Sequence, residues 1–234
     1  QLLLGKLEKA GVQAKITGMM ALIWREPAAA IHADAFSNLA LVLQNTTESR
    51  LRLQAVRLLI LALGDYHLQN PSMEVCTGYE LPHQSTGGEA MFRLLRQNLR
   101  DGLPSGDANL DVESARLLAM LGDDDPKAVG AVSSFLTNDS SATSDFHYLA
   151  VLSRLPAARS GEQTKQVAQT ILGLEKKLAE RKQRTARNWD LRLTEVVAGL
   201  IRHDSRLVDE LLNHPGFTTP SHVGLTAAFP PAKR

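Results

Sequence analysis

One segment of the chain, residues 65–87, brings together side chains that could do chemistry. It contains a thiol, two imidazoles and two phenols, which belong in chain order to Tyr66, His67, Cys76, Tyr79 and His83. A cysteine beside a histidine acts as a nucleophile when a third group orients the histidine and donors stabilise an oxyanion. The sequence shows neither of these further groups. We therefore expect a binding or packing loop, in which the candidate binding residues are Tyr66, His67, Tyr79 and His83.

The seven histidines and the single cysteine do not form a metal-binding pattern. No two histidines have the HExxH spacing, and one cysteine cannot supply paired thiolates. The three aspartates at 123–125 lack the alternating ligands and the distal glutamate of a calcium loop, and helix capping explains them. His203 and Asp204 lie at a predicted helix end, where a cation or a cap for the next helix is expected. We expect no cofactor and no metal site.

The basic stretch 176–192 is the sharpest charge feature of the chain. Its side chains could contact phosphates next to a stacking aromatic ring, and the candidate residues are Arg181, Lys182, Arg184, Arg187 and Trp189. Alternatively, the stretch is a solvated helix end that pairs with its own acidic neighbours, while Trp189 packs under the next helix. We favour the second interpretation, because charge runs on long helices are usually solvated faces. The neighbouring acidic residues are Glu175, Glu180 and Asp190.

The elements that must position these residues are predicted to be helices. Of the 234 residues, 44% are hydrophobic but only 5% are aromatic, and Leu and Ala dominate, which favours helices over sheets. Capping signals at Asp125-Pro126 and at Ser160 with Gln163 mark two helix starts. Helical spacing of apolar residues predicts helices over 1–10, 12–24, 34–44, 48–63, 88–100, 110–121, 126–136, 142–154, 160–184, 188–202 and 205–213.

One predicted helix pair occurs twice, at 35–65 and at 127–156. The offset between the two copies is 93 residues, or two units of roughly 46, within the ~40–47 range of HEAT and armadillo repeats. Because each pair must bury its apolar stripe against neighbours, matched positions are expected to be buried in both copies. These positions are Leu43, Leu53, Val56, Leu59, Leu136, Phe146, Leu149 and Leu152.

The repeat predicts an all-α fold, a HEAT/armadillo-like α-solenoid of antiparallel helix pairs with one long loop insertion. The degenerate repeat domain is expected to span 1–214, with the insertion at 65–87. Residues 215–234 hold four prolines and are expected to form an irregular C-terminal tail.

Charge and hydropathy exclude several classes of protein. Lys and Arg (26) nearly balance Asp and Glu (25), so no global field favours nucleic acid or an anionic membrane. The longest apolar runs fall far short of the ~20 residues that cross a bilayer, so no membrane insertion is expected. The chain begins at Gln1 inside an apolar helical segment, as we expect of a fragment of a longer polypeptide.

Four segments carry a resemblance to a known family: 103–126, 146–156, 188–201 and 213–223. Their phrases LPSGDANLDVESARLLAMLGDDDP, FHYLAVLSRLP, NWDLRLTEVVAGLI and NHPGFTTPSHV resemble the HEAT-like region of large multidomain proteins of planctomycete-type bacteria. The resemblance implies a helical-repeat module of an exported or envelope-associated protein. Some of those proteins carry a haem-binding CxxCH module or a dehydrogenase-like propeller elsewhere. This chain has no CxxCH, so haem binding is implied for none of its residues.

Three functions are therefore in competition. The leading hypothesis is a non-enzymatic helical-repeat scaffold that binds another protein or another domain of the same polypeptide. The second is a nucleic-acid-binding HEAT-like protein, similar to DNA glycosylases of that fold, which would use the basic stretch 176–192. The third is an enzyme that uses the 65–87 insertion. A nucleic-acid-binding protein must present its basic residues on one face, so the distribution of charge distinguishes the scaffold hypothesis from the nucleic-acid hypothesis.

Overall fold

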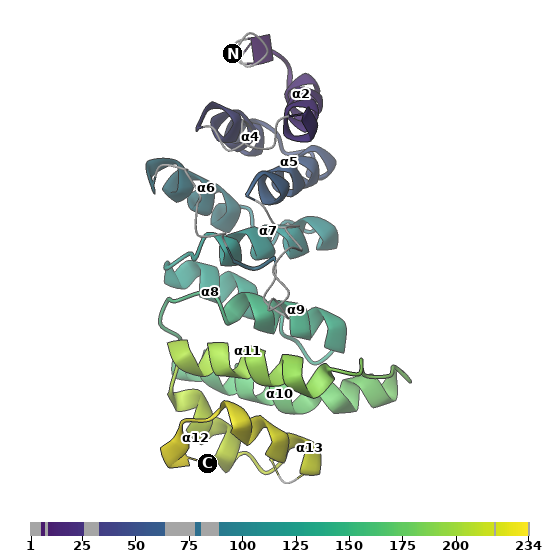
Figure 1. The fold of residues 1–234 in the computed structure, drawn as a ribbon, viewed down its shortest axis with the longest axis vertical. Coiled ribbons are helices and arrows are strands. Elements are labelled where there is room, and N and C mark those ends of the chain that lie inside the picture. Colours follow the sequence, from purple (N-terminus) through teal and green to yellow (C-terminus); the bar gives the residue numbers. More distant parts are fainter. Residues whose placement is uncertain are drawn as a thin grey trace. The chain divides into compact units, whose positions relative to one another are not determined.

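Helices are the regular secondary structure in the part of the chain that the structure describes. The computed structural model describes residues 6–7, 9–25, 33–63, 78–80, 89–217 and 219–233. Within these ranges it contains α-helices and short 3-10 helices and no β-strand, so the predicted all-α class is confirmed (Figure 1). Contacts divide the chain into two compact units, a first unit up to Leu121 and a second unit from Gly122 onward. This boundary lies inside the predicted 1–214 domain and was not expected from the sequence.

The first unit is centred on one helix that packs against three others. Its helices are α2 (Val12–Arg25), α4 (Ala33–Asn45), α5 (Ser49–Ala62), α6 (Glu89–Asp101) and α7 (Ala108–Met120). Helix α5 contacts α2, α4 and α7, and α6 contacts α4 and α7. Val56 and Leu59 of α5 and Leu117 of α7 are fully buried, so these contacts form the core of the unit.

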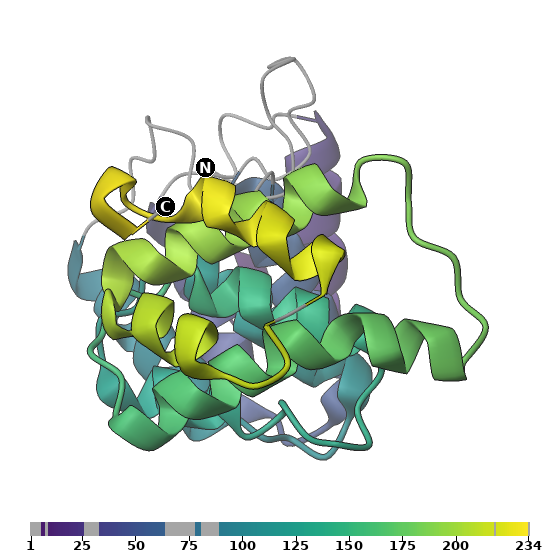
Figure 2. The same cartoon turned by 90° about the horizontal axis from the view of Figure 1, so that it is seen from below.

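The second unit contains two long helices that are flanked by shorter ones (Figure 2). Its elements are α8 (Pro126–Ser133), α9 (Ala142–Leu152), α10 (Gly161–Glu180), α11 (Trp189–His203), α12 (Arg206–Asn213), α13 (Pro220–Val223), η1 (Gly224–Ala228) and η2 (Pro231–Lys233). Helix α10 packs against α8, α9 and α12, while α11 packs against α9, α12 and η1. The loop between α10 and α11 stands out from the helices of the unit.

Two helices of the second unit begin at the caps that the sequence predicts. The Asp125 carboxylate accepts a hydrogen bond from the Lys127 amide at 2.9 Å, and Pro126 takes the first helical position. At the start of α10 the Ser160 hydroxyl accepts from the Gln163 amide at 3.2 Å, and the Gln163 carboxamide accepts from the Ser160 amide at 2.8 Å. Such a cap contributes ~1 kcal/mol. It also fixes which residues of α10 face its neighbours.

The C-terminal segment differs from the irregular tail that the sequence predicts. It contains α13, η1 and η2, and η1 packs against α11. Leu225 and Phe229 are buried there, and the Phe229 ring stacks on Phe217 with ring centroids 6.0 Å apart. The four prolines limit the helices to single turns but do not prevent them, because burial of these two side chains offsets the cost of ordering the backbone.

The second helices of the two copies begin at matching positions. Helices α5 and α9 begin at Ser49 and Ala142, 93 residues apart, and they follow α4, which is described from Ala33, and α8, which begins at Pro126. Six of the eight matched apolar positions are buried as predicted: Leu43, Val56, Leu59, Leu136, Leu149 and Leu152. The prediction was wrong for Leu53 and Phe146, which are half-buried. These two occupy equivalent positions, so the copies agree even where the prediction failed.

Candidate functional site

The predicted candidates of the 65–87 insertion lie mostly outside the described residues. Tyr66, His67, Cys76 and His83 belong to this undescribed part. Tyr79 is described and half-buried, with the Arg116 guanidinium 5.7 Å from its ring centroid. Arg116 of α7 also donates from Nε to the Gly78 carbonyl at 2.7 Å. These contacts hold residues 78–79 against α7, so Tyr79 has a packing role.

The basic residues near the end of α10 point to different partners. Lys176 lies 3.8 Å from Glu180, an exposed pair of the local kind that the sequence analysis favours. Lys177 reaches the Asp145 carboxylate of α9 at 2.6 Å. Arg181 donates from Nη2 to the Asp139 carbonyl at 2.9 Å. The stretch 176–192 therefore does not present all of its cations on one surface.

Lys182 ends α10 in a conformation that usually belongs to glycine. Its φ is 52°, and the Gln183 amide donates to the Leu178 carbonyl at 2.9 Å. This is the Schellman pattern of a helix C-terminus, in which a non-glycine residue is strained by ~1–2 kcal/mol. The turn ends the helix four residues earlier than the predicted end at 184 and sends the chain into the exposed loop that carries Arg184 and Arg187.

Arg184 and Trp189 come together in a pocket of about 420 Å³, which we call the aromatic–arginine pocket. It is lined by Thr143, Phe146, Leu178, Gln183, Arg184, Thr185, Ala186, Trp189 and Arg192. The rings of Phe146 and Trp189 lie with centroids 5.1 Å apart and planes tilted by 38°. Trp189 thus packs against α9 and is half-buried, while Arg187 is exposed and does not line the pocket. Two of the five predicted candidates in 176–192 share this site.

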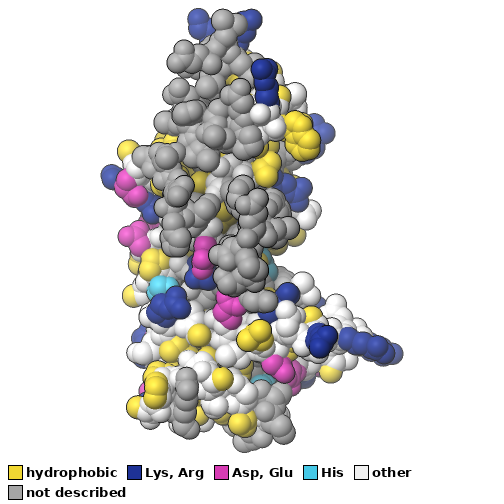
Figure 3. Space-filling view, in the orientation of Figure 1, with side chains coloured by type: hydrophobic (Ala, Val, Ile, Leu, Met, Phe, Trp, Pro, Cys, Tyr) yellow, Lys and Arg dark blue, Asp and Glu magenta, His cyan; other side chains and the backbone are white. Residues whose placement is uncertain are grey.

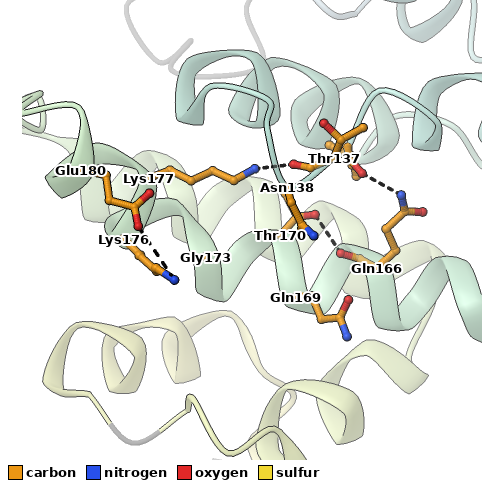
Figure 4. A pocket seen from close by; sticks show the side chains of 10 residues that line it. Thr137, Asn138, Gln166, Gln169, Thr170, Gly173, Lys176, Lys177 and Glu180 are labelled. Atoms are coloured by element: carbon orange, nitrogen blue, oxygen red, sulfur yellow. Dashed lines mark hydrogen bonds and ion pairs between the residues drawn. The ribbon is translucent and has the colours of Figure 1, made fainter.

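A second hollow, the α10 groove, runs between α10 and the loop at 137–140 (Figure 4). Its volume is about 700 Å³. It is lined by Leu136, Thr137, Asn138, Gln166, Gln169, Thr170, Gly173, Lys176, Lys177 and Glu180. Side-chain amides, hydroxyls and charged groups dominate this lining, so the groove suits a polar ligand that both donates and accepts hydrogen bonds.

The wall of the α10 groove opposite α10 is held in place by buried polar contacts. Asp145 is fully buried and accepts hydrogen bonds from Lys177 Nζ at 2.6 Å and from Ser140 Oγ at 2.5 Å. Lys177 also donates to the Thr137 carbonyl at 2.6 Å, and Gln166 Nε2 donates to the Leu136 carbonyl at 2.8 Å. The loop is therefore fixed to α9 and α10 before any ligand binds.

Gly173 forms a bare stretch of the groove floor in the middle of α10 (Figure 4). Glycine in a helix interior costs ~1 kcal/mol relative to alanine. A Cβ at this position would meet no atom within 4 Å, so packing within the protein does not require glycine here. The missing side chain leaves room for a ligand to approach the helix backbone closely.

A buried ionic cluster connects the ends of α10, α11 and α12. The Asp204 carboxylate accepts from Arg206 Nε at 2.8 Å and from Thr164 Oγ1 at 2.5 Å. Burial raises the pKa of Asp204, but the hydrogen bonds from Arg206 and Thr164 outweigh it and hold that pKa below its ordinary value. A carboxylate held ionised in this way is a poor general base. Asp204 also accepts from the Arg206 amide at 3.3 Å, which supports the predicted capping role.

His203 beside this cluster is kept neutral. Burial and the charges of Arg159, Arg202 and Arg154 lower its pKa below the ordinary value. The predicted role as a cation at a helix C-terminus is therefore wrong for His203, because neighbouring guanidinium groups oppose its protonation. Among the described residues, no group of three or more His, Cys, Asp or Glu side chains is arranged to hold a metal ion.

The α10 groove was not predicted as a site from the sequence. The α10 side of the groove is a stripe of polar and small residues at helical spacing, and this stripe is the one feature of the sequence that could have indicated the groove. Its residues are Gln166, Gln169, Thr170, Gly173, Lys176, Lys177 and Glu180. The facing wall, Leu136 to Asn138, is about thirty residues away in the chain, and only the fold brings the two together.

No family model matches this chain, and neither does any curated protein or solved structure. In the described part of the chain, none of the helices has the length and apolar character needed to span a membrane.

Proposed function

We propose that this chain is a HEAT/armadillo-like helical-repeat module that binds an extended segment of another protein, or of another domain of its own polypeptide. The observation that carries the proposal is the repeated helix pair, in which α5 and α9 start 93 residues apart and the apolar positions matched at this offset have the same burial in both copies. Arrays of such pairs present extended binding surfaces that they build from successive units, and an extended polypeptide segment suits such a surface.

The α10 groove is the binding surface in this proposal. An extended segment exposes backbone N–H and C=O groups at regular intervals, and both need partners when they leave water. The amides of Asn138 and Gln169 are exposed at the groove, and an amide both donates and accepts. Gly173, one turn after Gln169 on α10, lets a backbone approach the helix. The fixed loop wall reduces the ordering cost on the protein side.

Nucleic-acid binding, in the manner of HEAT-like DNA glycosylases, is the rival function. The presence of Arg184, Arg192 and Trp189 in one pocket favours it, because guanidinium and aromatic groups together bind phosphate and base. The ion pair of Lys177 with buried Asp145 argues against it, because it removes one cation, and the exposed cations that remain come from the end of α10 and its following loop rather than from several successive helices. We therefore keep it as the second function.

The family origin also stays a proposal. A place within a large multidomain protein of the planctomycete type would supply a partner domain on the same polypeptide and would make the protein exported or envelope-associated. An enzymatic role for the 65–87 insertion concerns residues outside the described part of the chain, apart from 78–80.

A display experiment tests the proposed function. A library of random linear peptides is selected against the purified chain, and selected peptides are titrated while amide hydrogen exchange is followed. We expect saturable binding that slows exchange in α10 and at residues 137–140. If no peptide is enriched, while duplex or single-stranded DNA binds tightly near physiological salt and is released by changing Arg184 and Arg192 to Ala, the protein-binding function fails and the nucleic-acid function replaces it.

A further inference from the structure

The aromatic–arginine pocket combines apolar walls with positive charge. Phe146 from α9, Leu178 from α10 and Trp189 from α11 provide the apolar surface. Arg184 from the loop and Arg192 from α11 line the same space of about 420 Å³. Three helices and one loop meet here, so the walls are held by the core of the second unit.

The neighbourhood of the pocket is basic as well. Lys182 and Arg187 are exposed on the loop that contributes Arg184, and Figure 3 shows Lys and Arg side chains gathered along this projecting part of the second unit. The acidic residues that flank this loop in sequence are Glu180, which pairs with Lys176, and Asp190, in the first turn of α11. A negatively charged ligand would therefore be attracted to the pocket, and a carboxylate of it would find the Arg184 guanidinium there.

The shape of the pocket favours a side chain over a nucleobase. The rings of Phe146 and Trp189 already contact each other, with centroids 5.1 Å apart, so a base cannot insert between them. A pocket of this size accepts one large apolar side chain whose neighbours stay in solvent. Nucleic acid would also require a track of cations from several helices, whereas Lys177 is paired with the Asp145 carboxylate and Arg181 donates to the Asp139 backbone carbonyl.

We propose that the aromatic–arginine pocket binds an acidic peptide segment, with an aromatic or aliphatic anchor against Phe146 and Trp189 and a flanking carboxylate on Arg184. This inference rests on the proposed protein-binding function and adds the chemistry of the partner. Such a segment pairs one buried anchor with charges at the rim, the arrangement by which peptide ligands gain both affinity and register.

The chain offers a direct reporter for this site. Its two tryptophans are Trp24 and Trp189, and the Trp24 side chain is 90% exposed. The substitution Trp24→Phe therefore leaves Trp189 as the only indole without disturbing a core. The probes are a short synthetic peptide of Asp, Glu, Ser and Gly with one central Phe, the same peptide with Ala for Phe, a version with Lys for the acidic residues, and oligothymidylate.

We expect the acidic Phe peptide to change Trp189 emission saturably and the Ala and Lys versions to have little effect. Arg184→Glu on the Trp24→Phe background should weaken binding by about tenfold or more, because it replaces attraction by repulsion. Lys165→Glu is the matched control, since Lys165 is exposed on α10 and does not line the pocket. Its effect should stay within about twofold.

Four results would overturn the inference. Equal losses for Lys165→Glu and Arg184→Glu would show that only net charge matters. Tighter binding of oligothymidylate than of the acidic peptide would assign the pocket to nucleic acid. An unchanged Trp189 signal, in a chain that still binds library-selected peptides, would refute the pocket and leave the protein-binding function standing. A chain that binds no peptide by any readout would refute both.

Discussion

At the scale of single residues, the contact between Lys177 and Asp145 is central because it fixes one wall of the α10 groove. The Asp145 side chain has no exposure to solvent, and Lys177 Nζ lies 2.6 Å from it. Removing one partner of a buried ion pair leaves a buried charge, which typically costs about 3–5 kcal/mol. We therefore predict that Lys177→Ala lowers the free energy of unfolding in urea by roughly 3 kcal/mol.

The neighbouring lysine provides the control for this prediction. Lys176 pairs with Glu180 at 3.8 Å on the exposed face of α10. Pairs of this kind contribute about 0–1 kcal/mol, so Lys176→Ala should change stability by less than ~1 kcal/mol. Similar losses for the two variants would show that Asp145 does not depend on Lys177.

His203 gives the molecule a pH dependence whose sign follows from its lowered pKa. The folded chain resists protonation of this imidazole, because burial and the charges of Arg159, Arg202 and Arg154 oppose it. The unfolded chain binds that proton below about pH 6.5, so folding stability falls as the pH drops below this value. The lowered pKa of Asp204 affects folding stability at more acidic pH. The stability that the ionised Asp204 carboxylate contributes is lost only as the pH falls below about 4.

We predict that His203→Gln reduces the loss of stability between about pH 7.5 and pH 5. The measurement is urea unfolding of wild type and variant at several pH values in this range. A variant that loses as much stability as the wild type over the interval would show that the imidazole titrates alike in folded and unfolded chains.

At the scale of helices, glycines distinguish close packing from open space. A Cβ at Gly199 of α11 would lie 2.9 Å from Ser153 Cβ and 3.2 Å from the Ser153 carbonyl oxygen, which follows α9. Overpacking costs about 1–3 kcal/mol, more than the ~1 kcal/mol that alanine gains in a helix. We predict that Gly199→Ala lowers the melting temperature and that Gly173→Ala raises it. The opposite order in thermal unfolding would contradict the helix contacts described above.

Most helix boundaries could be predicted from the sequence, because apolar spacing and caps act locally. The capping box at Ser160 is an example, since both of its hydrogen bonds join residues three apart. The end of α10 could not be predicted, because a lysine rather than a glycine adopts the left-handed conformation at 182. The tail could not be predicted either, because its short helices depend on the burial of Leu225 and Phe229 against distant residues.

In the candidate sites too, the features that depend on local sequence could be predicted and those that depend on long-range contacts could not. Trp189 and Arg184 were predicted from local composition, and the structure brings them together in one pocket. The groove could not be predicted as a whole, because Gln166 of α10 meets the Leu136 carbonyl only after α8, α9 and α10 have packed. A groove is formed by contacts between residues far apart in sequence, and such contacts are difficult to predict from a single sequence.

At the scale of the whole molecule, the division into two units carries its own prediction. Contacts within the second unit, from Gly122 to Arg234, are as dense as those within the first. Its core holds fully buried side chains from several helices, such as Leu149, Leu174 and Val196. We predict that a fragment spanning 122–234 is helical by circular dichroism and unfolds cooperatively in urea. A gradual, non-cooperative loss of helix would contradict the assignment of an independent core.

The central claim is that the chain binds an extended polypeptide in the α10 groove, and filling the groove tests it most directly. Gly173→Arg places a large side chain on the groove floor without a clash, because its Cβ meets open space. Gly161→Arg is the matched control, since Gly161 is exposed at the start of the same helix, its Cβ is also unobstructed, and it does not line the groove.

The measurement is the dissociation constant of one library-selected peptide, by fluorescence anisotropy, for the wild type and these two variants. The account predicts a loss of affinity of about tenfold or more for Gly173→Arg, because the arginine occupies the ligand's space, and a change within about twofold for Gly161→Arg. Equal affinities for all three proteins, each shown to be folded by circular dichroism, would contradict the account.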